Sequence, residues 1–126
     1  MHKTPTTDSE DALNYQEQVT GRPAWFVYMI GEEEFDGFNG TELLEAKGPR
    51  YIKFFNNDGT PKYWYVRSGG FNELIEQASA QSRMAERVKL SLTWHVADAK
   101  VAEFLREIFK DRGWNNITVR HTPPAP

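Results

Sequence analysis

FDGFNGTELLEAK, residues 35–47, is the stretch of sequence that decides how this chain folds. Asn39-Gly40 at its centre is a strong signal for a tight hairpin turn, because both residues readily adopt positive φ angles. Short strands are expected on either side, over about residues 34–38 and 42–47, and Gly48-Pro49 ends the second one. The stretch therefore predicts an antiparallel pair of strands in the first half of the chain.

The sequence before this hairpin predicts one helix and one strand. Asp8 or Ser9 is expected to cap a short helix that ends near Gly21, since Pro23 blocks any continuation. Residues 25–30 read WFVYMI, a continuous apolar run. Such a run predicts a strand covered on both faces.

The sequence after the hairpin alternates between helical and extended patterns. The expected elements are a helical turn within residues 50–57, a helix over 71–87, a strand over 88–95, a helix between Asp98 and Gly113, and a strand over 116–120. The helix after Asp98 is the clearest, because its apolar residues recur at three- and four-residue intervals. Residues 56–70 contain three Gly and one Pro and resist assignment.

The order of these elements, α-β-β-β-α-β-α-β, places the chain in the α/β (α+β) class. A hairpin-linked set of strands, followed by a crossover helix and a further strand, gives a mixed β-sheet flanked by helices. At 126 residues the chain is expected to form a single domain, residues 1–126. Frayed ends are expected at about residues 1–8 and 122–126.

The composition excludes several classes of site and protein. The chain has no cysteine, so disulfides and thiolate metal ligands are excluded. No apolar run approaches the roughly 20 residues of a membrane span, and the start MHKTPTTDSEDA lacks the apolar core of a secretory signal peptide. We therefore expect no membrane partner and no signal peptide in this chain.

The net charge of −3 is unevenly divided along the chain. Residues 1–47 carry three Lys or Arg against ten Asp or Glu, whereas residues 48–126 carry twelve against eight. This division suits a cation site next to a polyanion-binding surface, and it equally suits an ordinary acidic protein.

Three residues of the hairpin have a pattern with chemical meaning. Glu45 and Lys47 are two apart on one expected strand, so their side chains leave the same face. Asp36 lies nine residues before Glu45, across the turn, where pairing would bring the two carboxylates together. Two converging carboxylates repel each other unless a cation lies between them, as in Mg²⁺ or Mn²⁺ sites. The neighbouring Lys47 could orient or deprotonate a water, or neutralise charge on a phosphate.

The alternative is a purely structural arrangement. Asp36-Gly37 would then be a turn or strand end, and Glu45 and Lys47 a solvated cross-strand ion pair. The pattern Glu-x-Lys alone is weak evidence in a chain with 26% charged residues.

Two glutamines and one glutamate are further candidates. Gln77 and Gln81 are four apart on the expected helix over 71–87 and so share a face. They could steady a water or the substrate backbone, or they could be partly buried amides satisfied by the sheet. Glu17 on the first helix could add a third carboxylate, although a solvated helix residue is the simpler interpretation.

A basic and aromatic segment surrounds the unassigned middle of the chain. Its cationic residues could grip phosphates, and they are Arg50, Lys53, Lys62 and Arg67. The neighbouring aromatic residues 63–65 could stack on bases or form a packed cluster. His95 and His121 end strands and are interpreted as structural, and Glu32-Glu33-Glu34 as a solvated edge or a contact with a partner protein.

Several short segments resemble the restriction endonuclease fold toxin 5 family in order and spacing. In the first half they are Tyr15-Gln16, Thr20-Gly21-Arg22-Pro23, Phe35-Asp36-Gly37-Phe38 and Leu44-Glu45-Ala46-Lys47-Gly48. In the second half they are Gln77 and Gln81, the strand Leu92-Thr93-Trp94-His95, and Val119-Arg120-His121-Thr122-Pro123. The resemblance extends from about Tyr15 to Pro123.

The resemblance implies a PD-(D/E)xK core of the restriction-endonuclease type. Asp36 and Glu45 would be its metal ligands, for Mg²⁺ or Mn²⁺, and Lys47 its catalytic lysine. Several nucleases of this broad fold have a glutamine on the crossover helix that points at the site, and Gln77 or Gln81 would match it. Glu17 and Arg50 would have supporting roles at most.

The resemblance also implies a biological setting. Such domains usually form the C-terminal toxic tip of a larger bacterial effector, including type VI secretion effectors, and degrade DNA in a rival cell. A cognate immunity protein protects the producer. A contact-dependent system would then secrete the effector into the target-cell cytoplasm, with targeting carried by the rest of the polypeptide.

Two other functions stay open at the level of sequence. The same fold could cleave RNA instead of DNA. The chain could also be a non-catalytic interaction module whose acidic half recruits a partner.

Overall fold

A computed structural model describes residues 7–126, with side chains from residue 10 onward. Its main sheet has four strands in the order β3 (Gly37–Phe38), β4 (Glu42–Lys47), β5 (Ser91–Val96) and β6 (Ile117–His121). β3 and β4 are antiparallel, whereas β4, β5 and β6 run parallel to one another. The sheet is therefore mixed, as predicted.

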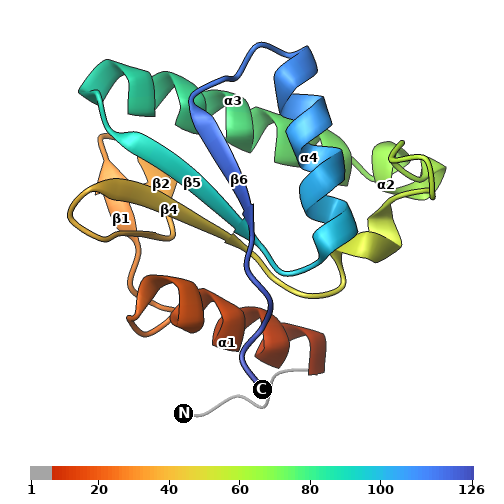
Figure 1. Ribbon diagram of the computed structural model, residues 1–126, viewed down its shortest axis with the longest axis horizontal. Coiled ribbons are helices and arrows are strands. Elements are labelled where there is room, and N and C mark those ends of the chain that lie inside the picture. Colours follow the sequence, from red (N-terminus) through yellow and green to blue (C-terminus); the bar gives the residue numbers. More distant parts are fainter. Residues whose placement is uncertain (1–6) are drawn as a thin grey trace.

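Helices cover both faces of this sheet. α3 (Gly70–Val88) and α4 (Ala99–Asp111) lie on one face, and α1 (Thr7–Thr20) lies on the other (Figure 1). The 3-10 helix η1 (Tyr51–Phe54) and the short α2 (Tyr63–Arg67) connect β4 to α3 and project beyond the end of the sheet. The predicted α/β class, a mixed sheet flanked by helices, is confirmed.

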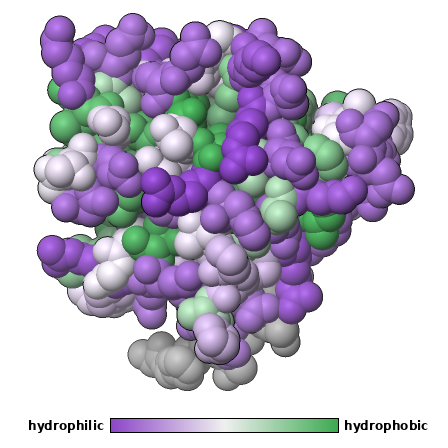
Figure 2. All heavy atoms as spheres, in the orientation of Figure 1, coloured by the Kyte–Doolittle hydropathy of each residue, from purple (hydrophilic) through white to green (hydrophobic). Residues whose placement is uncertain are grey.

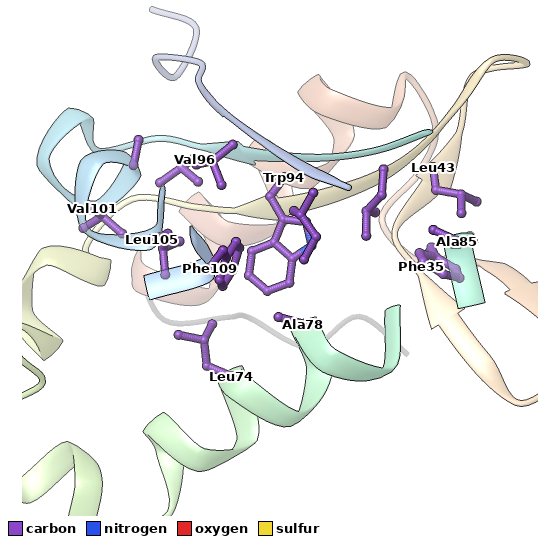
Figure 3. Close-up of a cluster of buried hydrophobic side chains, with 14 of the residues drawn as sticks. Phe35, Leu43, Leu74, Ala78, Ala85, Trp94, Val96, Val101, Leu105 and Phe109 are labelled. Atoms are coloured by element: carbon purple, nitrogen blue, oxygen red, sulfur yellow. The ribbon is translucent and has the colours of Figure 1, made fainter. Parts of the chain in front are cut away.

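The hydrophobic core lies between the sheet and the pair α3 and α4. Trp94 points from β5 into the centre of this layer, between Phe109 of α4 and Ala78 of α3 (Figure 3). The rings of Trp94 and Phe109 meet edge to face, with centroids 5.1 Å apart. Because side chains alternate along a strand, Glu45 and Lys47 share this inner face with Leu43.

The second half of the chain follows the sequence pattern closely. α3 covers the predicted 71–87, α4 lies between Asp98 and Gly113, and β6 buries Ile117 and Val119. The strand predicted over 88–95 begins only at Ser91, because α3 continues to Val88 and Lys89 ends it with a positive φ of 60°. α2 lies within the segment that resisted assignment.

The prediction for residues 25–30 is wrong. Only β1 (Tyr28–Ile30) is extended, and it pairs with β2 (Glu33–Phe35) in a separate two-stranded ribbon. α3 packs on β2, and of β1 only Ile30 reaches the core, so Trp25 is 77% exposed and Met29 50%. A continuous apolar run does not prove burial, because burial requires a second layer that the sequence did not reveal.

Three boundary predictions are also corrected. α1 already begins at Thr7, so Asp8 and Ser9 lie inside its first turn rather than before it. The strand predicted over 34–38 is divided at Asp36 into β2 and β3. Asp98 precedes α4, but its carboxylate accepts a hydrogen bond from the Ile52 amide (3.2 Å) and caps no amide of α4.

The expected frayed C-terminal end is instead held against α1. The Tyr15 hydroxyl donates to the Thr122 carbonyl (2.7 Å), and the Gln18 side chain bonds the main chain of Pro123 and Ala125. Residues 1–6 of the other expected frayed end lie outside the described residues. The face in Figure 2 is largely hydrophilic, with smaller apolar areas between the polar side chains. None of the helices within residues 7–126 combines the length and apolar character of a membrane span.

Candidate active site

The centre of the candidate site is a charged pair on β4. Glu45 and Lys47 leave the same face, and the Lys47 Nζ lies 3.0 Å from the Glu45 Oε2. Glu45 is 3% exposed and Lys47 6%, so the pair is buried under α3. The alternative of a solvated cross-strand ion pair is therefore wrong for these two residues.

Two glutamines of α3 complete the hydrogen bonding of this pair. Gln77 accepts from the Lys47 Nζ (2.6 Å) and donates to the Glu45 Oε2 (2.9 Å). Gln81 donates to the Glu45 Oε1 (2.9 Å) and accepts from the Trp94 indole N–H (2.9 Å). Gln77 and Gln81 are four residues apart on α3 and share a face, so both reach the Glu45–Lys47 pair on β4. Together they supply the hydrogen bonds that buried polar groups need. We call Glu45, Lys47, Gln77 and Gln81 the β4–α3 network.

The β4–α3 network keeps Lys47 charged. Burial alone would lower the pKa of its ammonium group, but the adjacent Glu45 carboxylate, with Tyr51 and Asp36, outweighs burial and raises that pKa above its ordinary value. The ammonium also lies 4.8 Å from the centre of the Trp94 ring, a cation–π distance.

Asp36 lies beside the network, between β2 and β3. Its Oδ2 accepts a hydrogen bond from the Ala46 amide (2.7 Å), which fixes the carboxylate next to the strand that carries Glu45 and Lys47. Burial and repulsion from the Glu45 carboxylate raise the pKa of Asp36 to about 7. The hairpin thus brings Asp36, Glu45 and Lys47 together, as the spacing predicted.

The donor chemistry of the two carboxylates suits a hard divalent cation. Asp36 and Glu45 offer only oxygen atoms, and their mutual repulsion is what a bound cation would relieve. A carboxylate has about four acceptor sites, so the three donors on Glu45 leave about one for a cation. Among the described residues no group of three or more Asp, Glu or His side chains converges on one point, so any further ligands would be main-chain carbonyl, water or substrate oxygens.

Two cavities open onto this site from different sides. Asp36 lines one of about 300 Å³, and Lys47 and Gln77 line another of about 450 Å³ beside η1 and α2. A larger hollow of about 800 Å³ lies between the end of α3 and residues 113–116, and none of the candidate residues lines it. The candidate site is therefore identified by the chemistry of its side chains and not by the volume of the cavity.

The two supporting candidates, Glu17 and Arg50, make their contacts with other parts of the chain. The exposed Glu17 accepts a hydrogen bond from the Ala24 amide (2.9 Å) and so holds the loop after α1. Arg50 forms an ion pair with Asp11 of α1, at 2.8 Å. Neither contact brings these residues to Glu45, so the expectation of direct support at the site is not met.

The other residues considered from the sequence divide into structural and exposed groups. His95 contacts the Thr122 hydroxyl (2.8 Å), and His121 contacts the Ala97 carbonyl (3.2 Å). Tyr65 is buried and stacks on Phe54 with ring centres 4.2 Å apart, whereas Tyr63 is 73% exposed. Of these aromatic residues, Tyr65 is therefore part of a packed cluster, whereas Tyr63 is exposed to solvent.

The sequence analysis missed one contributor to the site. From the sequence Trp94 was singled out only as part of the strand segment 92–95, yet its N–H donates to Gln81 and its ring faces Lys47. A buried Trp needs a partner for its N–H, and that rule would have paired it with a polar residue of the neighbouring helix.

Comparison with known proteins identifies the family of this chain. No curated protein sequence matches the chain. The sequence model of the family described as restriction endonuclease fold toxin 5 matches residues 12–99, which include Asp36, Glu45, Lys47, Gln77 and Gln81. The closing segment 119–123, which also carried the resemblance, lies outside that match. Since the match spans more than half of its length, the chain belongs to the restriction endonuclease fold toxin 5 family.

Proposed function

We propose that this chain is a metal-dependent nuclease that hydrolyses phosphodiester bonds of DNA. The observation that carries the proposal is the buried Glu45–Lys47 pair, held by two glutamines, with the carboxylate of Asp36 beside it. Membership of a toxin family with the restriction endonuclease fold supports a nuclease toxin.

Each residue of the site has a role in this proposal. Asp36 and Glu45 would hold Mg²⁺ or Mn²⁺, which supplies charge stabilisation on the phosphate and a more acidic water. Lys47 would stabilise negative charge that develops on the scissile phosphate. Its raised pKa favours this role over proton abstraction, because a protonated amine cannot act as a base.

Gln77 and Gln81 are positioning residues in this proposal. Gln77 bonds both Lys47 and Glu45, so it fixes the distance between a cationic and an anionic group. Gln81 is wholly buried and holds the other oxygen of Glu45. Pre-set geometry of this kind lowers the reorganisation that catalysis requires.

Purified protein and plasmid DNA provide the direct test. Cleavage is expected with Mg²⁺ or Mn²⁺ and none with a chelator present. Asp36→Asn should abolish cleavage while leaving the fold intact, whereas Glu103→Gln, an exposed change on α4, should cut like the parent chain. Full activity of Asp36→Asn or of Glu45→Ala would refute the assigned site.

A second candidate function is cleavage of RNA by the same site. The basic and aromatic surface around α2 suits either nucleic acid, because phosphate contacts and base stacking do not distinguish DNA from RNA. Parallel incubation with genomic DNA and total RNA separates the two, and degraded RNA beside intact DNA would overturn the choice of DNA. An interaction module without catalysis predicts no toxicity on expression and no cation binding by calorimetry.

The biological setting is part of the same proposal. The chain would be delivered by a bacterial contact-dependent system, as part of a larger effector, into the cytoplasm of a competitor, and a cognate immunity protein would neutralise it. Intracellular expression should be toxic for the wild type and harmless for Asp36→Asn. Rescue of growth by a small neighbouring reading frame would identify the immunity protein.

A further inference from the structure

The cavity that Asp36 lines has a wall made by an exposed aromatic segment. Thr20 and Arg22 after α1, residues 26–28 and residues 36–38 together form it, with a volume of about 300 Å³. Phe26 and Tyr28 contribute aromatic rings, and Tyr28 stacks on Phe38 with ring centres 5.0 Å apart. One carboxylate of the candidate active site thus shares a cavity with three aromatic side chains.

This aromatic wall is open to solvent. Phe26 is 44% exposed, and Trp25 beside it stacks on its ring at 4.7 Å with an interplanar angle of 22°. The ribbon of β1 and β2 is not hydrogen-bonded to the main sheet, and of the β1 residues only Ile30 packs against the core. Contiguous exposed apolar surface of this kind marks a binding site more often than a structural need.

Arg22 adds a cationic group at the rim. Its guanidinium lies 5.5 Å from the centre of the Phe26 ring, and no acidic side chain of residues 10–126 forms an ion pair with it. An arginine that is not engaged in an ion pair can bind a phosphate through the planar N–H donors of its guanidinium group. The rim therefore offers an aromatic face and an anion-binding group side by side.

The loop that carries these groups is fixed by α1. Gln16 donates to the Ala24 carbonyl (3.0 Å), Glu17 accepts from the Ala24 amide (2.9 Å), and Phe26 donates its amide to the Pro23 carbonyl (2.9 Å). A surface held in place in advance loses less conformational entropy when a ligand binds. These contacts also explain why Glu17 faces the loop and not the β4–α3 network.

We propose that this cavity binds one unpaired nucleobase of the substrate strand, stacked on Phe26, with an adjoining phosphate at Arg22. Its volume is at the lower end of the roughly 300–1,000 Å³ of small-ligand sites, which suits a single nucleotide, and a base can enter it only after leaving the duplex stack. The shared wall with Asp36 puts this nucleotide next to the cleavage site. The substrate class is then single-stranded nucleic acid, or duplex with an extruded base, and this part of the inference depends on the proposed nuclease function.

Binding, rather than cleavage, tests the proposal. Asp36→Asn protein binds a short fluorescent oligothymidylate in the absence of divalent cations, so no cutting interferes. Phe26→Ala in this background should weaken binding roughly 5- to 100-fold, the range expected for loss of one base–aromatic stack. An abasic strand of equal length should bind weakly to both proteins, and the matched duplex should not distinguish them.

Two further variants sharpen the result. Arg22→Gln should reduce the dependence of binding on salt by about one phosphate contact. Leu13→Ala, an equally exposed apolar change on α1, should leave oligothymidylate binding unchanged. Circular dichroism is expected to show all variants folded, because the replaced side chains are exposed.

Several outcomes would overturn the inference. They are equal binding by the parent and Phe26→Ala proteins, loss of binding only in Leu13→Ala, equal binding of the abasic strand, and a dimer by sedimentation that Phe26→Ala dissociates. A parent chain that cuts nucleic acid but shows one of these results retains the proposed function and loses the inference. A chain that binds through Phe26 but never cuts retains the base site and loses the nuclease function.

Discussion

The β4–α3 network and the segment of residues 25–29 are opposites in which side chains they expose to water. The network buries a carboxylate, an ammonium and two amides, with Glu45 at 3% and Gln81 at 0% exposure. Residues 25–29 expose five apolar or aromatic side chains at 37% or more. Both depart from the usual division, in which charges stay outside and large apolar groups inside.

In the β4–α3 network stability and function depend on the same residues, whereas in residues 25–29 they do not. The network lies on rigid elements, and within the described residues no buried side-chain polar atom lacks a partner. Removing one member would leave others unpaired, so function and stability are coupled there. Residues 25–29 contribute little burial, so changes there can affect binding without affecting the fold. Four experiments on folding test this contrast, in order of decreasing expected effect.

Glu45→Ala should have the largest effect on stability. It leaves the buried Lys47 ammonium without its anion, which costs about 3–5 kcal/mol for a buried pair. Urea unfolding monitored by circular dichroism measures the loss, and Glu103→Ala on α4 should stay within about 0.5 kcal/mol of the parent chain.

A double replacement makes this prediction more specific. Adding Lys47→Met to Glu45→Leu removes both charges together, and part of the lost stability should return. If the double variant loses as much free energy of unfolding as the two single variants together, the two charges do not depend on each other. The contrast between the network and residues 25–29 then fails.

Gln81→Leu should have the next largest effect. The Trp94 N–H and the Glu45 Oε1 would each lose a partner in a buried place, at a cost of about 1–3 kcal/mol. Thermal unfolding and the near-ultraviolet signal of Trp94 report the change. Glu76→Leu, an exposed position on the same helix, serves as the control and should unfold at nearly the parent temperature.

Asp36→Asn should change the pH dependence of stability in metal-free protein. The folded pKa of Asp36 is about 7 against 3.8 in the unfolded chain, so the folded state binds the proton more tightly. Its contribution is therefore fully present below pH 4 and is lost as the pH rises through 7. Stability of the parent chain relative to Asp36→Asn should fall across this window, by at least about 1 kcal/mol.

Denaturant titrations at pH 4, 5, 6, 7 and 8 on both proteins measure this difference. Glu103→Gln, which removes an exposed carboxylate of α4, is a control for general effects of lost charge. If the difference in free energy of unfolding between the parent chain and Asp36→Asn does not vary with pH, Asp36 is not held against Glu45.

Trp25→Gln should have the smallest effect on stability. The side chain is 77% exposed, so the free energy of unfolding should change by no more than about 0.5 kcal/mol. The same urea titration provides the measurement, and Trp94→Gln, a change in the core, should by comparison unfold the chain or nearly so. A loss above 1 kcal/mol for Trp25→Gln would show that the segment is packed and that the contrast is false.

The amino-acid sequence was sufficient to predict the class of fold and which candidate side chains lie close together. Periodicity placed α3, α4 and β6 within a few residues, because a helical or alternating apolar face is written directly in local spacing. The Asn39-Gly40 turn, together with the spacing of Asp36, Glu45 and Lys47, was enough to predict that these three side chains meet. These are short-range properties of the chain.

Only the tertiary structure decided which groups are buried and by what. The run 25–30 is wholly apolar and β4 is half charged, yet Glu45 and Lys47 of β4 are buried against α3 whereas residues 25–29 are exposed. Glu17 and Arg50 looked like site residues, but the position of α1 directs them to Ala24 and Asp11. Burial depends on which distant elements pack together, and that depends on contacts summed over the whole chain rather than on local pattern.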